Sequence, residues 1–241
     1  MATSTAMPLY HQIKEDLLES IKGGRLTPGD RVESEPELMD RYGVSRATVR
    51  QALGQLVAEG YLVIRRGLGT YVAEPKIRQG LLGMYSFSRE IERLGMRPGT
   101  HVQALAVEPA GPSVAAALGI SPGDPVVALR RLRSADDEPI ILETSWLPVG
   151  RFPGLVDRDL EHTRLYDVLA DAYGVRPSRA REEFEPVLLS SDDARLLGKH
   201  AGDPALLLER VAFDAEGRPI EFCRSVVRGD RCRYFVELRA L

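Results

Sequence analysis

The chain has 241 residues, of which 44% are hydrophobic and 28% charged, and its net charge is −3. This is the composition of an ordinary folded protein of one or two domains, and its two cysteines, Cys223 and Cys232, form neither a disulfide framework nor a metal-ligand spacing, so we expect a reduced, cytoplasmic protein without structural zinc. No stretch approaches the ~20 apolar residues that span a bilayer, and residues 1–7 lack the features of a signal peptide.

The charge is unevenly distributed along the chain. Residues 41–78 contain seven basic and two acidic side chains, a net charge of +5, which leaves −8 on the remainder. A localised positive patch on an otherwise acidic protein favours binding of a polyanion by one face.

The N-terminal part is predicted to contain three helices. Apolar residues recur every fourth position from Leu9 to Ile21 and end at a pair of glycines, which predicts a helix over residues 8–22. Ser34, with Glu37 three residues later, has the signature of a capping box and predicts a second helix that ends at Gly43. A helix that begins this way can also receive a phosphate at its N-terminus.

Residues 45–59 are predicted to form the third helix, with Ser45 as its N-cap. Its apolar residues fall on one face. Polar side chains point elsewhere, and Arg and Gln are the side chains that pair bidentately with guanine and adenine in the major groove. The alternative for an isolated helix of this kind is a solvated surface. The polar set is Arg46, Thr48, Arg50 and Gln51.

A β-hairpin is expected next, with strands at 61–66 and 70–72 and a glycine-containing tip. Arg65 and Arg66 precede the tip. Because Gly67 and Gly69 leave the tip without bulky side chains, its backbone can approach a phosphate chain or a minor groove. Three helices followed by a hairpin is the plan of a winged helix-turn-helix, in which the helix at 45–59 enters the major groove.

These segments together resemble the DNA-binding domain of GntR-family bacterial repressors. The motifs that carry the resemblance are Pro8-Leu9-Tyr10-His11-Gln12-Ile13, Leu26-Thr27-Pro28-Gly29-Asp30, Ser34-Glu35, Tyr42-Gly43-Val44-Ser45-Arg46, Thr48-Val49-Arg50 and Gly67-Leu68-Gly69-Thr70-Tyr71-Val72. The candidate DNA-binding residues are Ser34, Glu35, Ser45, Arg46, Thr48, Arg50, Gln51, Arg65, Arg66, Gly67 and Gly69.

The chain changes character after a polar segment at 75–80, which we interpret as a linker between a DNA-binding domain at 1–74 and a second domain at 81–241. The second domain alternates pairs of strands with helices, which predicts an α+β fold with an antiparallel sheet and helices to one side. Predicted strands are 101–108, 126–134, 140–147, 181–188, 205–214 and 219–227; predicted helices are 86–94, 113–118, 165–173 and 191–197.

An internal repeat links residues 112–143 with residues 192–221. The matching segments Gly123-Asp124-Pro125 and Gly202-Asp203-Pro204 each follow a helical stretch and precede a strand pair. Two similar halves that face each other form a cleft, which is a common place for a ligand.

Two arginines are expected to point together into this cleft. Arg131 and Arg133 are two positions apart on one strand and project from the same face, and paired guanidiniums match a phosphate or carboxylate. The alternative is a salt-bridged surface, with Asp136, Asp137 or Glu143 as the partner.

The second domain resembles the UTRA domain of the HutC subfamily of GntR regulators, which is similar in fold to chorismate lyase. The better-marked points are residues 131–136, 147–148, 152–155, 165–166 and 228–231. The resemblance implies that the effector is a phosphorylated sugar or another acidic metabolite, and Arg164 adds a cation there unless it points to solvent. The effector-binding candidates are Ser86, Phe87, Ser88, Arg131, Arg133, Glu143, Arg164, Tyr166 and Glu221.

The sequence therefore indicates a transcriptional regulator, a repressor, that binds a near-palindromic operator as a homodimer under control of a small anionic ligand. No cofactor, metal site or catalytic residue is expected, because the four histidines have no partner at the spacing of a triad or metal site. The alternative is an enzyme of chorismate lyase-like fold that acts on an anionic small molecule and carries a DNA-binding head.

Overall fold

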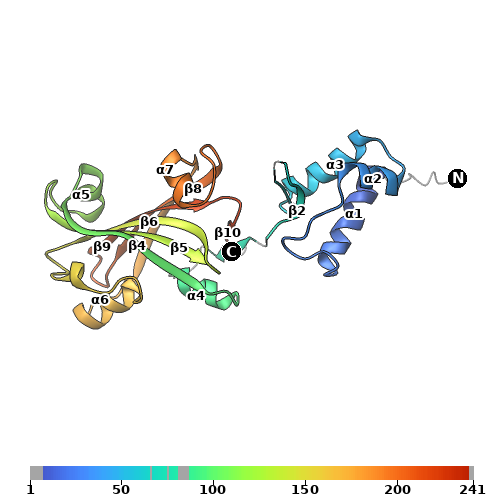
Figure 1. Ribbon diagram of the computed structural model, residues 1–241. Helices are drawn as coiled ribbons and strands as arrows, with labels where there is room; N and C mark the ends of the chain where they lie inside the picture. Colours follow the sequence, from blue (N-terminus) through green and yellow to red (C-terminus); the bar gives the residue numbers. More distant parts are fainter. Residues whose placement is uncertain (1–7, 66, 75, 81–86, 239–241) are drawn as a thin grey trace. The chain divides into compact units, whose positions relative to one another are not determined.

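The computed structural model of the protein describes residues 8–65, 67–74, 76–80 and 87–238 (Figure 1). The chain divides into two compact units, Met1–Lys76 and Ile77–Leu241, which are described separately. Within the described ranges, no helix has both the length and the apolar character needed to cross a bilayer.

The first unit packs three helices against a two-stranded antiparallel hairpin, as predicted. Its elements are α1 (Leu9–Lys22), α2 (Glu35–Tyr42), α3 (Arg46–Ala58), β1 (Leu62–Arg65) and β2 (Gly69–Val72). One apolar cluster joins them, with Ile13, Leu38 and Leu56 fully buried at its centre. Arg31 forms an isolated β-bridge with Tyr71, so the segment between α1 and α2 lies against the hairpin.

The start and end signals read from the sequence are confirmed for α2 and α3. The capping box of Ser34 and Glu37 precedes α2, and Gly43 follows it with φ 63°, in the left-handed region. Ser45 caps α3, because its hydroxyl oxygen accepts a hydrogen bond from the Thr48 N–H. Gly43 and Ser45 thus bound the three-residue turn between α2 and α3.

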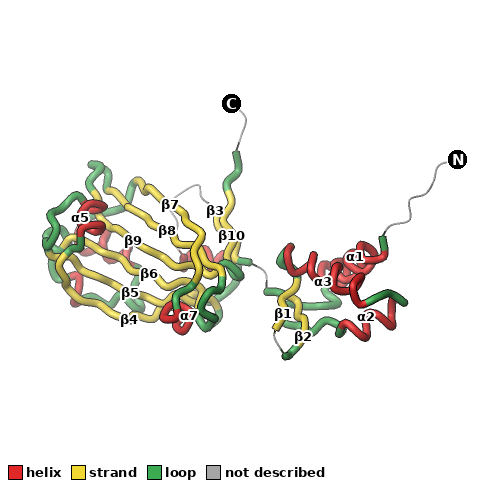
Figure 2. The backbone as a smooth tube through the Cα atoms, turned by 90° about the horizontal axis from the view of Figure 1, so that it is seen from above, coloured by secondary structure: helices red, strands yellow, loops and turns green. Residues whose placement is uncertain are grey.

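The second unit is built on a six-stranded antiparallel sheet in the order β4-β5-β6-β9-β8-β7, seen from above in Figure 2. The internal repeat is visible in this order, because β6 and β9 meet at the centre and each half is a β-α-β-β unit. The first half comprises β4 (Pro98–Pro109), α5 (Pro112–Leu118), β5 (Pro125–Ala135) and β6 (Glu138–Pro148). The second comprises β7 (Arg179–Leu188), α7 (Ser191–Leu196), β8 (Pro204–Phe213) and β9 (Pro219–Arg228).

Helices cover both faces of this sheet, so the expectation of helices to one side is wrong. The reason lies in adjacent residues such as Val126 and Val127, which point to opposite faces and are both buried. Val126 packs with Leu118 of α5, whereas Val127 packs with Leu169 of α6. Figure 1 shows α5 and α7 on one side and α4 (Phe87–Arg93) and α6 (Leu165–Tyr173) on the other, where the short 3-10 helix η1 (Leu155–Asp157) also packs.

Residues 77–80, predicted as part of the linker, form a strand instead. β3 (Ile77–Gly80) pairs in parallel with β10 (Cys232–Phe235), and the Ile77 N–H donates to the Arg231 carbonyl oxygen at 2.7 Å. The pattern in β3 alternates, with Ile77 and Gln79 buried and Arg78 exposed. A four-residue strand without a run of apolar residues gives little sequence signal, and its partner lies more than 150 residues away.

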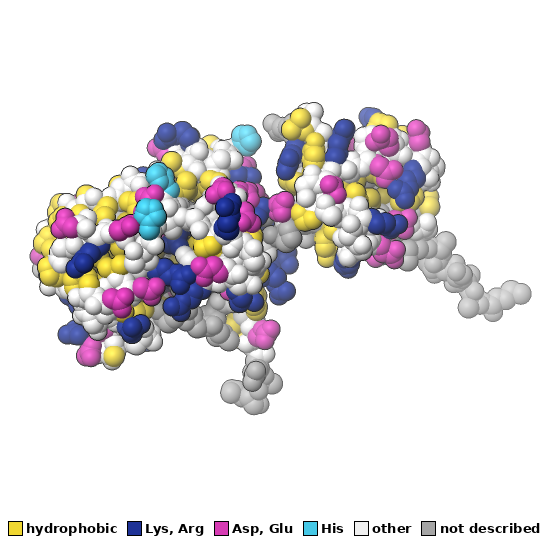
Figure 3. All heavy atoms as spheres, turned by 60° about the horizontal axis from the view of Figure 1, so that its bottom comes forward, with side chains coloured by type: hydrophobic (Ala, Val, Ile, Leu, Met, Phe, Trp, Pro, Cys, Tyr) yellow, Lys and Arg dark blue, Asp and Glu magenta, His cyan; other side chains and the backbone are white. Residues whose placement is uncertain are grey.

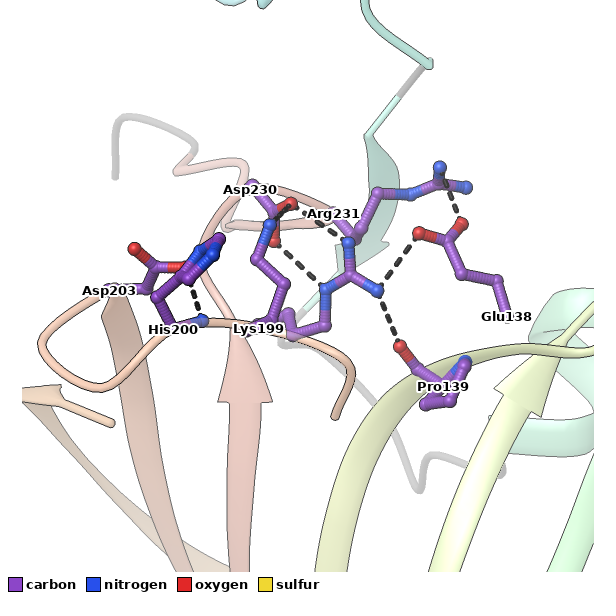
Figure 4. Close-up of polar contacts among 8 residues, drawn as sticks. Glu138, Pro139, Lys199, His200, Asp203, Asp230 and Arg231 are labelled. Atoms are coloured by element: carbon purple, nitrogen blue, oxygen red, sulfur yellow. Dashed lines mark hydrogen bonds and ion pairs between the residues drawn. The ribbon is translucent and has the colours of Figure 1, made fainter. Parts of the chain in front are cut away.

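A cluster of polar contacts that includes Glu138, Asp230 and Arg231 braces the end of the sheet next to β10 (Figure 4). The Arg228 guanidinium donates to both carboxylate oxygens of Asp230 at 3.0 and 2.9 Å and to the Pro139 carbonyl oxygen at 2.7 Å. Glu138 lies between Arg228 and Arg231, at 2.9 and 2.7 Å. The turn between β5 and β6 is thereby tied to the segment that receives β3.

Candidate DNA-binding surface and ligand cavity

The polar side of α3 is open to solvent. Arg46 and Arg50 lie one helical turn apart, with side chains 64% and 71% exposed. Gln51 is also exposed and Thr48 is half-buried. The opposite face is buried and consists of Val49, Ala52, Leu53 and Leu56. The helix therefore offers two guanidiniums and an amide outward while its apolar face holds it in the domain.

The donors at the start of α2 are largely engaged within the helix. Ser34 donates its backbone N–H and its hydroxyl to the Glu37 carboxylate, each at 2.7 Å. These bonds lower the pKa of Glu37. Pro36 contributes no N–H, and Glu35 adds a carboxylate at the first helical position. The predicted phosphate contact at this N-terminus thus has few free donors and a negative charge beside it.

The hairpin tip needs its two glycines, because Gly67 and Gly69 have φ of 73° and 122°, in the left-handed region. The expectation of a tip without bulky side chains is wrong, since Leu68 is 61% exposed there. The Arg65 guanidinium stacks over the Tyr71 ring at 4.6 Å. Arg66 lies outside the described residues.

Arg31 is a basic residue of this surface that sequence reasoning missed. Arg31 is exposed, and its guanidinium lies close to the backbone of Gly69. A side chain at position 69 would place its Cβ only 3.2 Å from Arg31 Nε. Arg31 lies beside the hairpin because residues 30–32 pair with β2. The sequence shows only a short extended piece there and carries no signal for its partner.

The second unit contains a cavity of about 600 Å³, within the size range of small-molecule sites. Its walls come from α4, α6, the segment 160–164 and the face of the sheet opposite α5 and α7. Of the predicted effector residues, the structure brings together Phe87, Ser88, Arg131, Arg133, Glu143, Arg164, Tyr166 and Glu221. Ser86 lies outside the described residues.

One carboxylate lies between the two predicted arginines. Glu143 Oε1 is 2.7 Å from Arg131 Nη2 and 3.0 Å from Arg133 Nη1. Arg133 also donates to Ser88 Oγ at 2.8 Å, and its guanidinium carbon lies 5.0 Å from the centre of the Phe87 ring. The salt-bridge alternative is therefore correct for Glu143, although the pair lies in the cavity and not on an open surface. Asp137 pairs with Arg97 instead.

The cluster of Arg131, Arg133 and Glu143 contains two positive charges and one negative charge. Arg131 and Arg133 are 6% and 8% exposed, and the Nε of each has no hydrogen-bond partner. Burial opposes ionisation of Glu143, but the charges of the two arginines outweigh it and lower its pKa. Two guanidiniums thus share one carboxylate, so this part of the cavity carries a net positive charge.

The other side of the cavity carries a hydroxyl and a carboxylate. The Tyr166 hydroxyl donates to Glu221 Oε2 at 2.5 Å, and burial together with the Glu221 charge raises the pKa of Tyr166 well above its usual value. Cys223 lies next to them, where burial and nearby carboxylates raise the pKa of its thiol to about 12. Cys223 is therefore an uncharged wall of the cavity and a poor nucleophile.

Arg164 lines the cavity and does not point simply to solvent. Its Nη2 donates to both carboxylate oxygens of Glu92, at 2.7 and 2.8 Å. Because Glu92 offsets its charge, Arg164 contributes less to the positive potential of the cavity than the sequence suggested.

Arg210 is a cavity residue that the prediction missed. It reaches the cavity from β8 and its Nε donates to Glu182 at 2.6 Å. The internal repeat could have found it, because Arg210 occupies in the second half the position of Arg131 in the first. In all, six arginines and five carboxylates line the cavity, and Figure 3 shows basic and acidic side chains interspersed on that face of the unit.

The described residues include no group of three or more His, Cys, Asp or Glu side chains placed to hold a metal ion. Of the four histidines, His162 lies at the cavity wall, where its ring Nδ1 is 3.0 Å from Asp159. This side chain is 80% exposed, which fits its interpretation as a solvated residue.

Comparison with known proteins agrees with the two units. Residues 9–72 match the bacterial regulatory proteins of the gntR family, and residues 93–233 match the UTRA domain. Each match falls within one of the two compact units.

Several relatives are similar over nearly the whole chain. The HTH-type transcriptional repressor NagR of Bacillus subtilis (strain 168) is 36% identical over 225 residues, which cover 93% of this chain and 92% of that protein. The HTH-type transcriptional repressor PhnF of Mycolicibacterium smegmatis is 36% identical over 241 residues, 99% of this chain and 97% of that protein. Among solved structures, that of PhnF from Mycobacterium smegmatis superposes with a TM-score of 0.68 and 34% identity, covering 95% of this chain and 100% of that chain.

Proposed function

Because this chain belongs to the GntR family of bacterial regulatory proteins and carries a UTRA effector domain, it is a DNA-binding transcriptional regulator, and we propose that it is a homodimeric repressor controlled by an acidic metabolite. It is a regulator and not an enzyme, because the family and its named relatives are regulators. The enzyme alternative has no support, and the proposed action on DNA calls for a cytoplasmic protein.

On the DNA side, the proposal assigns base reading to α3. Arg46 and Arg50 are the guanine readers, because both guanidiniums are exposed on one face of the helix. Thr48 and Gln51 contribute further contacts from the same helix. Phosphate contacts come from the start of α3 and from the wing: Ser45, Arg65, Arg66, Gly67 and Gly69.

On the effector side, the observation that carries the proposal is the shared carboxylate. Arg131 and Arg133 are buried against the single charge of Glu143, and an unbalanced buried charge is costly. A ligand anion at Ser88, Arg131 and Arg133 would balance it and engage the unpartnered Nε groups.

The opposite side of the cavity suits hydroxyl groups on the same ligand. Glu221 and Tyr166 form a short hydrogen bond there, and each can exchange its partner for a ligand hydroxyl. An anion at one end and hydroxyls at the other describe a phosphorylated sugar or a similar acidic metabolite. Phe87 supplies an apolar wall, and Arg164, paired with Glu92, lines the cavity beside it.

Two copies of the chain fit the DNA better than one. A single recognition helix reads few bases, whereas a two-fold dimer reads two half-sites of a near-palindrome. The effector then acts only through its different affinities for the DNA-competent and DNA-incompetent states of that dimer.

Fluorescence anisotropy with the protein's own upstream promoter DNA tests the proposal. We expect specific binding at moderate salt, and a change in that binding when phosphorylated sugars, organic phosphonates or other acidic metabolites are added in turn. Folded protein that shows no preference for the promoter over unrelated DNA would refute the DNA-binding role.

A further inference from the structure

The Glu35 carboxylate lies between the two arginines that α3 presents to solvent. Glu35 Oε2 is 3.4 Å from Arg46 Nε, and Glu35 Oε1 is 3.7 Å from Arg50 Nε. The Glu35 side chain is 37% exposed, whereas the two arginines are 64% and 71% exposed. One acid on α2 thus contacts both arginines, each through a separate oxygen.

Glu35 is not required to begin α2. The capping box is made by Glu37, whose carboxylate accepts the Ser34 N–H and hydroxyl. Among the described residues, Glu35 forms its ion pairs with Arg46 and Arg50. As an exposed ion pair it contributes little to folding, and its favourable interaction with the dipole of α2 does not depend on contact with two arginines of another helix.

The electrostatic consequence is specific to α3. Arg46 and Arg50 are like charges one helical turn apart, which repel each other. Without an acid between them, both guanidiniums would be drawn to the nearest phosphates, and phosphate contacts carry no sequence information. Glu35 neutralises one of the two charges and repels phosphate from the same place.

The geometry also orients the guanidiniums. The nearest approach of Glu35 to each arginine is at Nε, so its ion pairs do not use the terminal Nη1 and Nη2 groups of the two exposed guanidiniums. That pair of donors is the fork that matches O6 and N7 of guanine.

We propose that Glu35 is a positioning residue that directs Arg46 and Arg50 to base edges and away from the phosphate backbone, and so sets the sequence specificity of the regulator. The proposal rests on the DNA-reading role of α3 given above. It assigns to Glu35 a function different from a phosphate contact at the start of α2.

The chain supplies a matched control two residues away. Glu33 pairs with Arg41 at 2.7 Å, and Arg41 belongs to α2 and not to the recognition helix. Glu33→Gln and Glu35→Gln therefore remove the same charge from the same domain and release one or two exposed arginines. Any general gain in attraction to DNA appears in both variants.

The test selects binding sites from a pool of duplexes with a randomised central segment, using the full-length wild type, Glu35→Gln, Glu35→Asp and Glu33→Gln. Affinities for the selected duplex and for an unselected duplex are then measured over a range of salt. We expect the ratio of specific to non-specific affinity to fall about tenfold in Glu35→Gln. The slope of log affinity against log salt concentration should become steeper by about the amount that one added phosphate contact gives. Glu33→Gln keeps the wild-type ratio, and Glu35→Asp, with a shorter reach, lies between.

The outcomes are distinguishable. A broadened base preference in Glu35→Gln but not in Glu33→Gln supports the assignment. Equal selected motifs and equal ratios in the two variants, with unchanged thermal unfolding, would overturn it while leaving the DNA-binding function intact. If the wild type enriches no sequence at all, the DNA-reading role of α3 itself is wrong, and the role of Glu35 falls with it.

Discussion

Replacing Arg133 with alanine is the most informative perturbation of the cavity. The change removes the hydrogen bonds to Glu143 and Ser88 at 3.0 and 2.8 Å and the stacking on Phe87. Glu143 keeps Arg131 at 2.7 Å, so the variant retains a neutral buried pair. The loss of folding stability should therefore be about 1–2 kcal/mol, well below the ~3–5 kcal/mol of an ion pair broken outright.

The effect on the ligand should be much larger. An anion held by Arg133 loses two charge-assisted hydrogen bonds of about 1.5 kcal/mol each, which together correspond to roughly a hundredfold in affinity. DNA affinity without effector should remain that of the wild type, because Arg133 belongs to the second unit.

Differential scanning fluorimetry measures this with inorganic phosphate first and then with phosphorylated sugars, and anisotropy measures the DNA affinity. Arg130→Ala is the matched control, since Arg130 is on the same strand but pairs with Asp193 of α7 on the other face. We expect stabilisation by the anion in the wild type and in Arg130→Ala, and none in Arg133→Ala. An undiminished shift in Arg133→Ala would place the anion site elsewhere.

Three further predictions follow from other parts of the molecule. Arg50→Ala should weaken binding to the selected operator by about 1–3 kcal/mol and relax the base preference at one position of each half-site. Fluorescence anisotropy on duplexes with single base changes measures both effects. Equal weakening on all sequences would show that Arg50 contacts a phosphate and not a base. Asp214 accepts from the Arg218 backbone N–H at 2.7 Å and from the Arg151 and Arg218 side chains at 2.6 and 2.9 Å, and although burial raises its pKa, these bonds lower it to about 2. Because that pKa lies below the usual 3.8, the contribution of Asp214 to stability is present at neutral pH and is lost as the pH falls from about 4 toward 2. In urea unfolding, Asp214→Asn should therefore be less stable than the wild type at pH 7 and similar to it near pH 2. An equal loss of stability at both pH values would contradict this. Arg228→Leu should lower the free energy of unfolding by about 1–3 kcal/mol, less than a fully broken ion pair, because Asp230 keeps its contact with Lys199 and Glu138 keeps its contact with Arg231. Hydrogen exchange of the Ile77 amide should become faster in this variant. An unchanged exchange rate would show that the contacts of Arg228 do not stabilise the pairing of β3.

Local chemistry made the first unit readable from sequence. Ser34 with Glu37 and Ser45 with Thr48 are caps whose partners lie three residues away, so short spacing alone located the starts of α2 and α3. The position of Arg31 beside the wing was not readable, because it depends on a pairing with Tyr71, forty residues later.

The cavity was partly readable for the same reason. Two-residue alternation placed Arg131 and Arg133 on one face of a strand, and the resemblance to a known domain suggested the remaining residues. The sharing of Glu143 by both arginines required the register of β5 against β6, in which Arg131 lies opposite Glu143. Arg210 required the order of the whole sheet, since it enters from β8, two strands beyond β6.

The sequence by itself determined the helices, the hairpin, the α+β character of the second unit and the family, because periodicity, caps and motifs act over short stretches of chain. Only the tertiary structure decided that helices cover both faces of the sheet, that residues 77–80 pair with β10 and that Glu35 lies between Arg46 and Arg50. Each of these depends on contacts between segments far apart in the sequence, and their energies come from burial and charge that no local pattern records.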